Sequence, residues 1–166
     1  MIIRDACPAD LSAIAGIMNY YRAHTTHIWD RTPVDANTMD VWLRGHSALP
    51  YCALVAEDDG KVIGYASLSR FRPHSGYAKT AEDSIYLEPG FAGHGYGATL
   101  MKALLDQAKQ NGLRIVTAWI DSRNTQSVKF HERMGFELVG IMKDVGLTDG
   151  TPASVIIMQI DLLRSL

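Results

Sequence analysis

Hydrophobic residues along the chain repeat at two spacings, and each spacing predicts one type of element. A spacing of three to four residues predicts helices at residues 11–21, from about residue 35, at 100–108 and at about 124–134, with Asp10 as the candidate N-cap of the first. Runs rich in β-branched and aromatic residues predict strands at residues 1–6, 51–57, 62–69, 85–87 and 114–120, from residue 136, and at 155–162.

The turn between the second and third predicted strands is a strong local signal. Asp59-Gly60 separates two β-rich runs, and Asp-Gly at such a point favours a two-residue hairpin, so these strands should be antiparallel. No internal repeat, linker or low-complexity tract interrupts the chain. The pattern predicts an α+β fold, in which a mixed central sheet is flanked by helices in a single domain over residues 1–166.

Composition limits the function classes. The chain has 166 residues, 47% of them hydrophobic, which is enough for a substantial core. A formal net charge of −2 predicts neither a nucleic-acid footprint nor an anionic-membrane surface. Cys7 and Cys52 are isolated and lack zinc-ligand spacing, so we expect free thiols and no metal. With no signal peptide and no long apolar run, the protein is expected to be soluble and cytoplasmic.

A glycine-rich loop follows the central predicted strand. Pro89-Gly90 ends that strand, Gly93, Gly95 and Gly97 come next, and the third helix begins after them. Glycines allow a positive φ and a close ligand approach, and the free N–H groups and dipole of the helix attract an anion. The loop lacks the Gly-Lys-Ser/Thr of a P-loop and the spacing of a dinucleotide fingerprint. We expect it to bind phosphate in another way.

The fourth predicted helix carries a polar stripe. Asn124, Ser127 and His131 are spaced i, i+3 and i+7, so they share one helix face. One interpretation is an ordinary helix capped by Asn124, with His131 a surface or core histidine. The other is a helix face that lies against a polar ligand.

Together these two stretches resemble the GNAT acyl-CoA N-acetyltransferases. Gly95 and Gly97 match the glycines of that superfamily's pyrophosphate loop, although Ala92 stands where its first anchor is usual. Residues 124–136 match its Asn-x-x-Ser/Ala-x-x-x-Tyr/His-x-x-x-Gly-Phe pattern. Over the whole chain, residues 28–33 and 77–86 and these two stretches resemble the phosphinothricin and methionine sulfoximine N-acetyltransferases.

The resemblance implies a GNAT-like, mostly antiparallel sheet, acetyl-CoA as co-substrate, and usually a homodimer. It implies direct acetyl transfer to the α-amino group of a small amino acid or analogue, of the phosphinothricin, methionine sulfoximine or methionine sulfone type. Near the end the chain departs from the family, with Pro152 and Ser154 where a tryptophan and an aspartate are usual, which affects the substrate more than the chemistry. The residues expected to bind acetyl-CoA are Ile85, Tyr86, Leu87, Gly93, His94, Gly95, Tyr96, Gly97, Ala98, Asn124, Ser127 and Arg133.

Acetyl transfer needs three functions, and the sequence offers a candidate for each. Glu82 is the candidate base that deprotonates the ammonium substrate. The backbone N–H of Leu87 is the candidate donor to the oxyanion. His131 is the candidate that protonates the leaving thiolate, because an imidazole can donate near neutral pH. The alternative for Glu82 is a solvated carboxylate at a strand end.

Cations and hydrogen-bond donors cluster before Glu82 and suit a substrate carboxylate or phosphinate. The expected substrate contacts are Arg72, His74, Tyr77, Lys79, Thr80, Glu82 and, as a wall of the side-chain pocket, Trp29. Two other functions stay open: a GNAT enzyme for another amine, such as a polyamine or a protein N-terminus, and a non-catalytic CoA-binding sensor. A polyamine site should be rich in acidic residues, which this loop is not.

Overall fold

The strand-forming runs assemble into one seven-stranded sheet in the computed structural model, which describes residues 1–164. The order across the sheet is β1-β2-β3-β4-β5-β7-β6, and only β4 and β5 are parallel neighbours. The strand bounds are β1 Ile2–Asp5, β2 Cys52–Asp58, β3 Lys61–Arg70, β4 Thr80–Leu87, β5 Ile115–Asp121, β6 Glu137–Thr148 and β7 Thr151–Asp161. The mixed, mostly antiparallel sheet is therefore confirmed.

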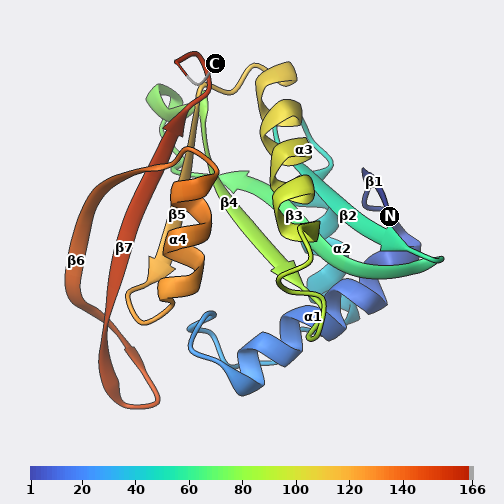
Figure 1. Ribbon diagram of the computed structural model, residues 1–166, viewed down its shortest axis with the longest axis horizontal. Coiled ribbons are helices and arrows are strands. Elements are labelled where there is room, and N and C mark those ends of the chain that lie inside the picture. Colours follow the sequence, from blue (N-terminus) through green and yellow to red (C-terminus); the bar gives the residue numbers. More distant parts are fainter. Residues whose placement is uncertain (165–166) are drawn as a thin grey trace.

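Within the described residues, four α-helices cover the two faces of this sheet (Figure 1). They are α1 Leu11–His24, α2 Ala36–His46, α3 Tyr96–Gln110 and α4 Thr125–Arg133, with short 3₁₀ turns at Pro8–Asp10 and Ser75–Tyr77. One core packs Leu100, Met101 and Leu104 of α3 against the sheet. A second core, on the opposite face, packs Ile14 of α1 and Met39 of α2 against Val55 and Tyr65. The sheet thus separates an α3–α4 face from an α1–α2 face.

The Asp59-Gly60 hairpin is confirmed. Both residues have positive φ, 49° and 76°, and β2 and β3 are antiparallel on either side of them. This is the geometry that a tight hairpin turn requires and that glycine and aspartate tolerate.

The expected cap at Asp10 is wrong. Its side chain makes no cap hydrogen bond to α1. The carboxylate, 4% exposed, instead accepts from the Cys7 N–H at 2.8 Å and forms an ion pair with Arg4 at 2.7 Å. Arg4 comes from β1, and a buried carboxylate is more stable beside a cation than beside a single helix N–H. By contrast, Asp35 caps α2 through the Thr38 N–H.

The last strand begins earlier than the pattern predicts. β7 starts at Thr151, directly after a turn in which Asp149 and Gly150 have φ of 52° and 74°. Proline is rare inside strands, so Pro152 argued against a strand at this position. In the structure Pro152 pairs with Leu147 close to the end of the hairpin.

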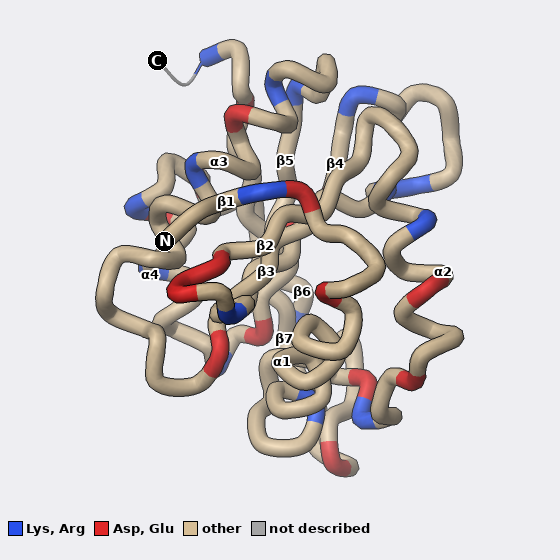
Figure 2. The backbone as a smooth tube through the Cα atoms, turned by 90° about the vertical axis from the view of Figure 1, so that its right-hand side faces the viewer, with Lys and Arg blue, Asp and Glu red and all other residues tan. Residues whose placement is uncertain are grey.

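Charges of both signs are spread along the chain (Figure 2). Within residues 1–164, no helix is long and apolar enough to cross a membrane.

Candidate active site

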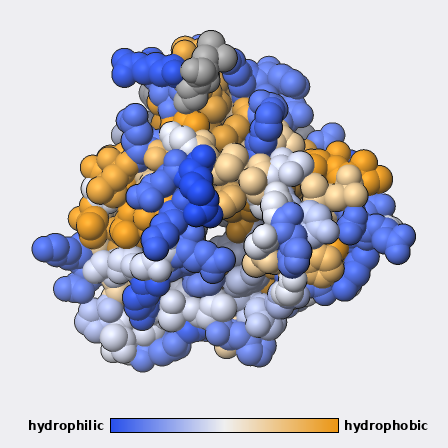
Figure 3. All heavy atoms as spheres, in the orientation of Figure 1, coloured by the Kyte–Doolittle hydropathy of each residue, from blue (hydrophilic) through white to orange (hydrophobic). Residues whose placement is uncertain are grey.

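The two parallel strands separate and leave a cleft between them. β4 and β5 pair only from Thr80 to Glu82 on one strand and from Ile115 to Thr117 on the other, and they diverge beyond that point (Figure 1). The cleft has a volume of about 970 Å³. It is lined by β4, β5, the glycine loop, α4 and the connection between α1 and α2, and a hollow is visible near the middle of the face in Figure 3.

Alternation along β4 gives the cleft two chemically different sides. Ile85 and Leu87 pack with the α3 core, whereas Tyr86 packs with the α1–α2 core. Because successive side chains point to opposite faces, Asp83 lies on the α3–α4 side and Glu82 on the α1–α2 side. The candidate base and the helix that carries His131 are therefore on opposite faces of the sheet.

Backbone donors of β4 point into the gap between the strands. The Glu88 N–H donates to the Ile63 carbonyl at 2.8 Å, which makes 88 and 63 a hydrogen-bonded pair of the antiparallel ladder. The alternate residues Leu87 and Ile85 then turn their backbone groups away from β3 and toward β5, where the ladder has ended. The Leu87 carbonyl accepts from the Tyr21 hydroxyl at 2.9 Å. The N–H of Leu87, the predicted oxyanion donor, thus faces the cleft.

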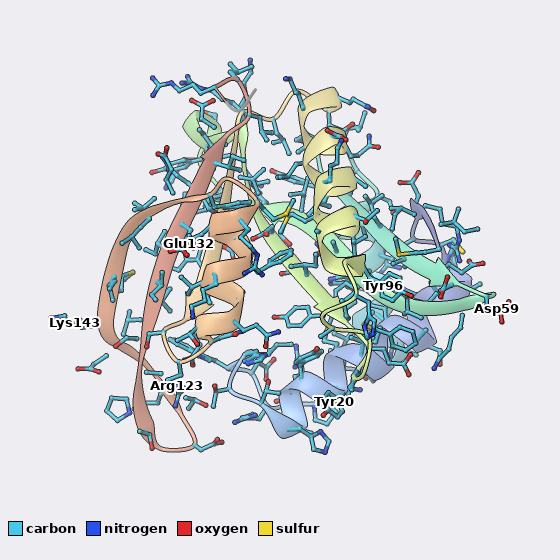
Figure 4. The ribbon with its side chains drawn as sticks, in the orientation of Figure 1. Tyr20, Asp59, Tyr96, Arg123, Glu132 and Lys143 are labelled. Carbon is cyan, nitrogen blue, oxygen red and sulfur yellow. The ribbon has the colours of Figure 1, made fainter. Side chains whose placement is uncertain are left out.

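The glycine loop has the predicted geometry for an anion site. Gly93 and Gly95 have φ of 86° and 84°, and Gly95 is the N-cap residue of α3. A Cβ at either position would meet nothing within 4 Å, so both backbones are open to a ligand. In Figure 4, Tyr96 marks the start of α3 and Arg123 lies just before α4, and both helices begin at their lower ends in this view.

The residues predicted to bind acetyl-CoA divide into two groups. Ten line the cleft: Ile85, Tyr86, Leu87, Gly93, Gly95, Gly97, Ala98, Asn124, Ser127 and Arg133. His94 and Tyr96 are not among the lining residues, and their rings stack on each other with centroids 6.0 Å apart. Open glycine backbones and the first N–H groups of α3, next to the cleft, fit the pyrophosphate of acetyl-CoA.

Both interpretations of the fourth helix contribute. Asn124 does cap α4, since its side chain accepts from the Ser127 N–H at 3.1 Å. Ser127 and His131 nevertheless also line the cleft. His131 is only 3% exposed, because it packs edge to face against Phe130 and Phe136.

A buried pair that the sequence analysis missed holds the imidazole. His131 Nε2 lies 3.0 Å from an Asp83 carboxylate oxygen, and Nδ1 lies 2.8 Å from the Ser127 carbonyl oxygen. A carbonyl only accepts, so Nδ1 carries a hydrogen. Burial alone would lower the pKa of His131, but the hydrogen bond and charge of Asp83, with the Ser127 carbonyl, raise it above its ordinary value. The imidazole therefore keeps its proton to a higher pH than a free histidine does.

This geometry does not resemble an activated serine, although Asp83, His131 and Ser127 are aligned. The Ser127 hydroxyl lies 3.3 Å from Nδ1. Because Nδ1 already donates to a carbonyl, it has no lone pair with which to take the hydroxyl proton. The arrangement therefore does not activate Ser127 as a nucleophile.

Glu82 has the environment of a general base. It lines the cleft, and its carboxylate has no hydrogen-bond partner among residues 1–164. Burial and the nearby charge of Asp83 raise the pKa of Glu82, while the charge of Arg72 partly opposes them. A carboxylate whose pKa moves toward neutrality is a better proton acceptor at physiological pH.

The other predicted substrate residues occupy different positions. Trp29 lines the cleft. The Arg72 guanidinium lies over the ring of Trp119, a lining residue, at 5.3 Å from its centroid. Arg72 does not itself line the cleft, and neither do His74, Tyr77, Lys79 and Thr80. His74, Tyr77 and Lys79 are exposed, and Thr80 is the first residue of β4.

Known proteins resemble this chain in sequence and in fold. Residues 14–136 match the acetyltransferase (GNAT) family. A methionine sulfoximine/methionine sulfone acetyltransferase of Pseudomonas paraeruginosa is 40% identical over 161 residues, covering 96% of this chain and 94% of the relative. An acetyltransferase structure from Salmonella typhimurium, solved with acetyl-CoA, has a TM-score of 0.94 and 36% identity, covering 98% of this chain and 94% of that one.

A third relative is a phosphinothricin acetyltransferase from Sinorhizobium meliloti in complex with acetyl-CoA, with a TM-score of 0.92 and 34% identity, covering 96% of this chain and 87% of that one. The chain belongs to the GNAT acetyltransferase family. It is an acetyl-CoA-dependent N-acetyltransferase, as the resemblance implied.

Proposed function

We propose that the protein acetylates the α-amino group of a small amino acid or amino-acid analogue, of the methionine sulfoximine, methionine sulfone or phosphinothricin type. The observation that carries this proposal is Glu82, a half-buried carboxylate without a partner among the described residues, in the cleft on the face opposite α4. The names of the relatives indicate the substrate class. The proposal takes residues 1–166 as a single N-acetyltransferase domain.

The proposed reaction is direct attack within a ternary complex. Glu82 accepts the proton that the ammonium substrate must lose, either directly or through water. The free amine forms the new C–N bond at the thioester carbonyl, and the Leu87 N–H donates to the oxyanion. When the C–S bond breaks, the sulfur keeps the electron pair and accepts a proton from the α4 side of the cleft.

On that side, we assign the proton donation to His131 acting together with Ser127. Both ring nitrogens of His131 are already hydrogen-bonded, whereas the Ser127 hydroxyl lies within 3.3 Å of Nδ1. The hydroxyl passes its proton to the sulfur and takes the Nδ1 proton of the imidazolium in return, which leaves a neutral imidazole hydrogen-bonded to Asp83.

Substrate recognition is assigned to two side chains. Trp29 forms a wall of the amine pocket, and Arg72, whose charge acts on Glu82, supplies a cation for the substrate's carboxylate or phosphinate. His74, Tyr77, Lys79 and Thr80 remain predicted contacts of the same loop. Cys7 and Cys52 have free thiols, which fits the reducing cytoplasm where we place the enzyme.

A homodimer is part of this proposal. β6 is one of the two edge strands of the sheet, and it exposes apolar side chains along its length, among them Leu138 at 62%, Ile141 at 54% and Leu147 at 68%. Apolar surface is visible on the β6 side of the molecule in Figure 3. Unprotected apolar edge strands favour association. Sedimentation of wild type and Ile141→Lys tests it: a dimer that the variant dissociates supports the interface, and a wild-type monomer removes it.

The substrate test is consumption of acetyl-CoA against a panel of amines. The panel contains methionine sulfone, methionine sulfoximine, phosphinothricin, several amino acids, spermidine and a peptide with a free N-terminus, with Glu82→Gln as the control enzyme. Turnover confined to the first four groups supports the proposal. Preference for spermidine or the peptide would replace the substrate class, and no turnover with intact acetyl-CoA binding would indicate a sensor.

A further inference from the structure

The connection between α1 and α2 is fastened to the far side of the cleft by one aromatic side chain. Trp29 donates its indole N–H to an Asp121 carboxylate oxygen at 2.8 Å, although 92 residues separate the two in sequence. Its ring covers Gly146 of β6. Trp29, Asp121 and Val145 of β6 line the cleft, whereas Gly146 does not, so the ring lies between Gly146 and the cleft.

Asp121 provides a fixed anchor at the end of β5. Its side chain is fully buried in the fold, and Arg123 donates to it from the backbone N–H, from Nε at 2.9 Å and from a terminal nitrogen at 2.6 Å. Burial would raise the pKa of Asp121, but the bonds from Arg123 and Trp29 lower it to about 2. The anchor therefore stays ionised at neutral pH and holds the indole in one orientation.

Gly146 provides the space that the ring occupies. A Cβ at this position would lie 2.2 Å from Trp29 Cζ3 and 2.7 Å from Cε3. Carbon atoms in contact are about 3.5 Å apart or more, so alanine would displace the ring by roughly 1.3 Å. The register of β6 on β7 shifts between Met142 and Gly146, which bends the strand at this contact.

We propose that Asp121 and Gly146 are positioning residues that fix Trp29 as a wall of the amine pocket and thereby limit the length of amino-acid side chain that the enzyme accepts. This inference rests on the proposed function. Neither residue needs to touch the substrate. Asp121 holds the polar edge of the indole, and Gly146 lets the ring lie flat against β6, away from the substrate.

The physical consequence is directional. A side chain at position 146 pushes the ring away from β6 and so into the cleft. Helices α3 and α4, whose N-terminal ends form the acetyl-CoA side, pack on the opposite face of the sheet from α1 and α2. The amine subsite therefore becomes shorter while the acetyl-CoA subsite stays as it was.

The test compares Gly146→Ala with Gly140→Ala. Both glycines are in β6, but a Cβ at Gly140 meets nothing within 4 Å. Gly146→Ala should raise the KM for methionine sulfone by about tenfold or more, and by less for a shorter amino acid, while the KM for acetyl-CoA is unchanged. Gly140→Ala should match wild type. A wild-type amine KM in Gly146→Ala, or an equal rise in both KM values, overturns the inference.

Further variants separate the clash from a general effect on the fold. In a Trp29→Ala background the ring is gone, so adding Gly146→Ala should leave the amine KM unchanged, and a further rise would contradict the inference. If Gly146→Ala does not fold, Trp29→Phe provides the test. Loss of the indole N–H bond to Asp121 should raise the KM for the amine and leave the KM for acetyl-CoA unchanged. An unaltered amine KM overturns the role of Asp121 as the anchor of Trp29. Absence of wild-type turnover on amino acids would instead refute the proposed function.

Discussion

Replacing Asp83 with asparagine should make the protein less stable in a manner that depends on pH. The Asp83 and His131 side chains are 2% and 4% exposed, and their bond joins β4 to α4 across the α3–α4 side of the cleft. Asparagine keeps the volume and removes the negative charge. The imidazolium then either loses its partner in a buried site or gives up its proton.

The magnitude follows from burial. Removing one partner of a buried ion pair costs about 3–5 kcal/mol, and an amide that can still donate to neutral Nε2 recovers about 1 kcal/mol of that. We therefore expect a loss of roughly 3 kcal/mol at low pH. Because folding raises the pKa of His131, the pair's contribution is full below the unfolded pKa, about 6.5, and is lost as pH rises through the folded pKa. The difference between variant and wild type should shrink accordingly.

The assay is urea unfolding of wild type and Asp83→Asn at a series of pH values from about 5.5 to 9, above the acid range in which carboxylates titrate. Asp106→Asn is the matched control, since it breaks an exposed i,i+4 pair with Lys102 and should change stability by less than about 0.5 kcal/mol. A loss for Asp83→Asn that does not vary with pH, or one as small as that of the control, would refute the reasoning.

Three further changes test the cofactor side of the cleft. Gly95→Val forces a β-branched residue to a φ of 84° and should weaken CoA binding at least tenfold, about 1.4 kcal/mol, by calorimetry; a folded variant with unchanged affinity would remove the loop from the site. His131→Ala should lower kcat about 10²-fold or more with little change in the amine KM, whereas a loss confined to KM would indicate positioning alone. Ser127→Ala should reproduce much of the kcat loss in steady-state assays. A wild-type kcat would show that the Ser127 hydroxyl does not transfer the proton to the sulfur.

Local patterns predicted the parts of the site that a few consecutive residues build. The anion site of the glycine loop depends only on its own backbone and on the helix that follows it, so the sequence of Gly93 to Gly97 predicts it. The same is true of the face of α4, because i, i+3 and i+7 positions coincide on any helix. The hairpin at Asp59-Gly60 follows from local turn chemistry.

Contacts between residues far apart in the sequence could not be predicted from local patterns. Asp83 and His131 are 48 positions apart, and only the fold brings them together. A signal was present, because a carboxylate alternates with the apolar residues of β4 on its inner face, but no local rule names the partner. The same limit applies to Trp29, whose anchors Asp121 and Gly146 come from β5 and β6. Tertiary hydrogen bonding also overrode the local cap expected at Asp10.

The central claim is that Glu82 deprotonates the α-ammonium of the substrate, and the pH–rate profile of Glu82→Gln tests it most directly. A free α-ammonium has a pKa well above neutrality, so at pH 7 most substrate must lose a proton in the cleft. Glutamine keeps the size of the side chain and removes the basic site, and CoA binding should survive. We expect kcat/KM to fall about 10²-fold or more at pH 7, with a deficit that shrinks as pH approaches the pKa of the substrate. Parallel profiles of equal height would contradict the account.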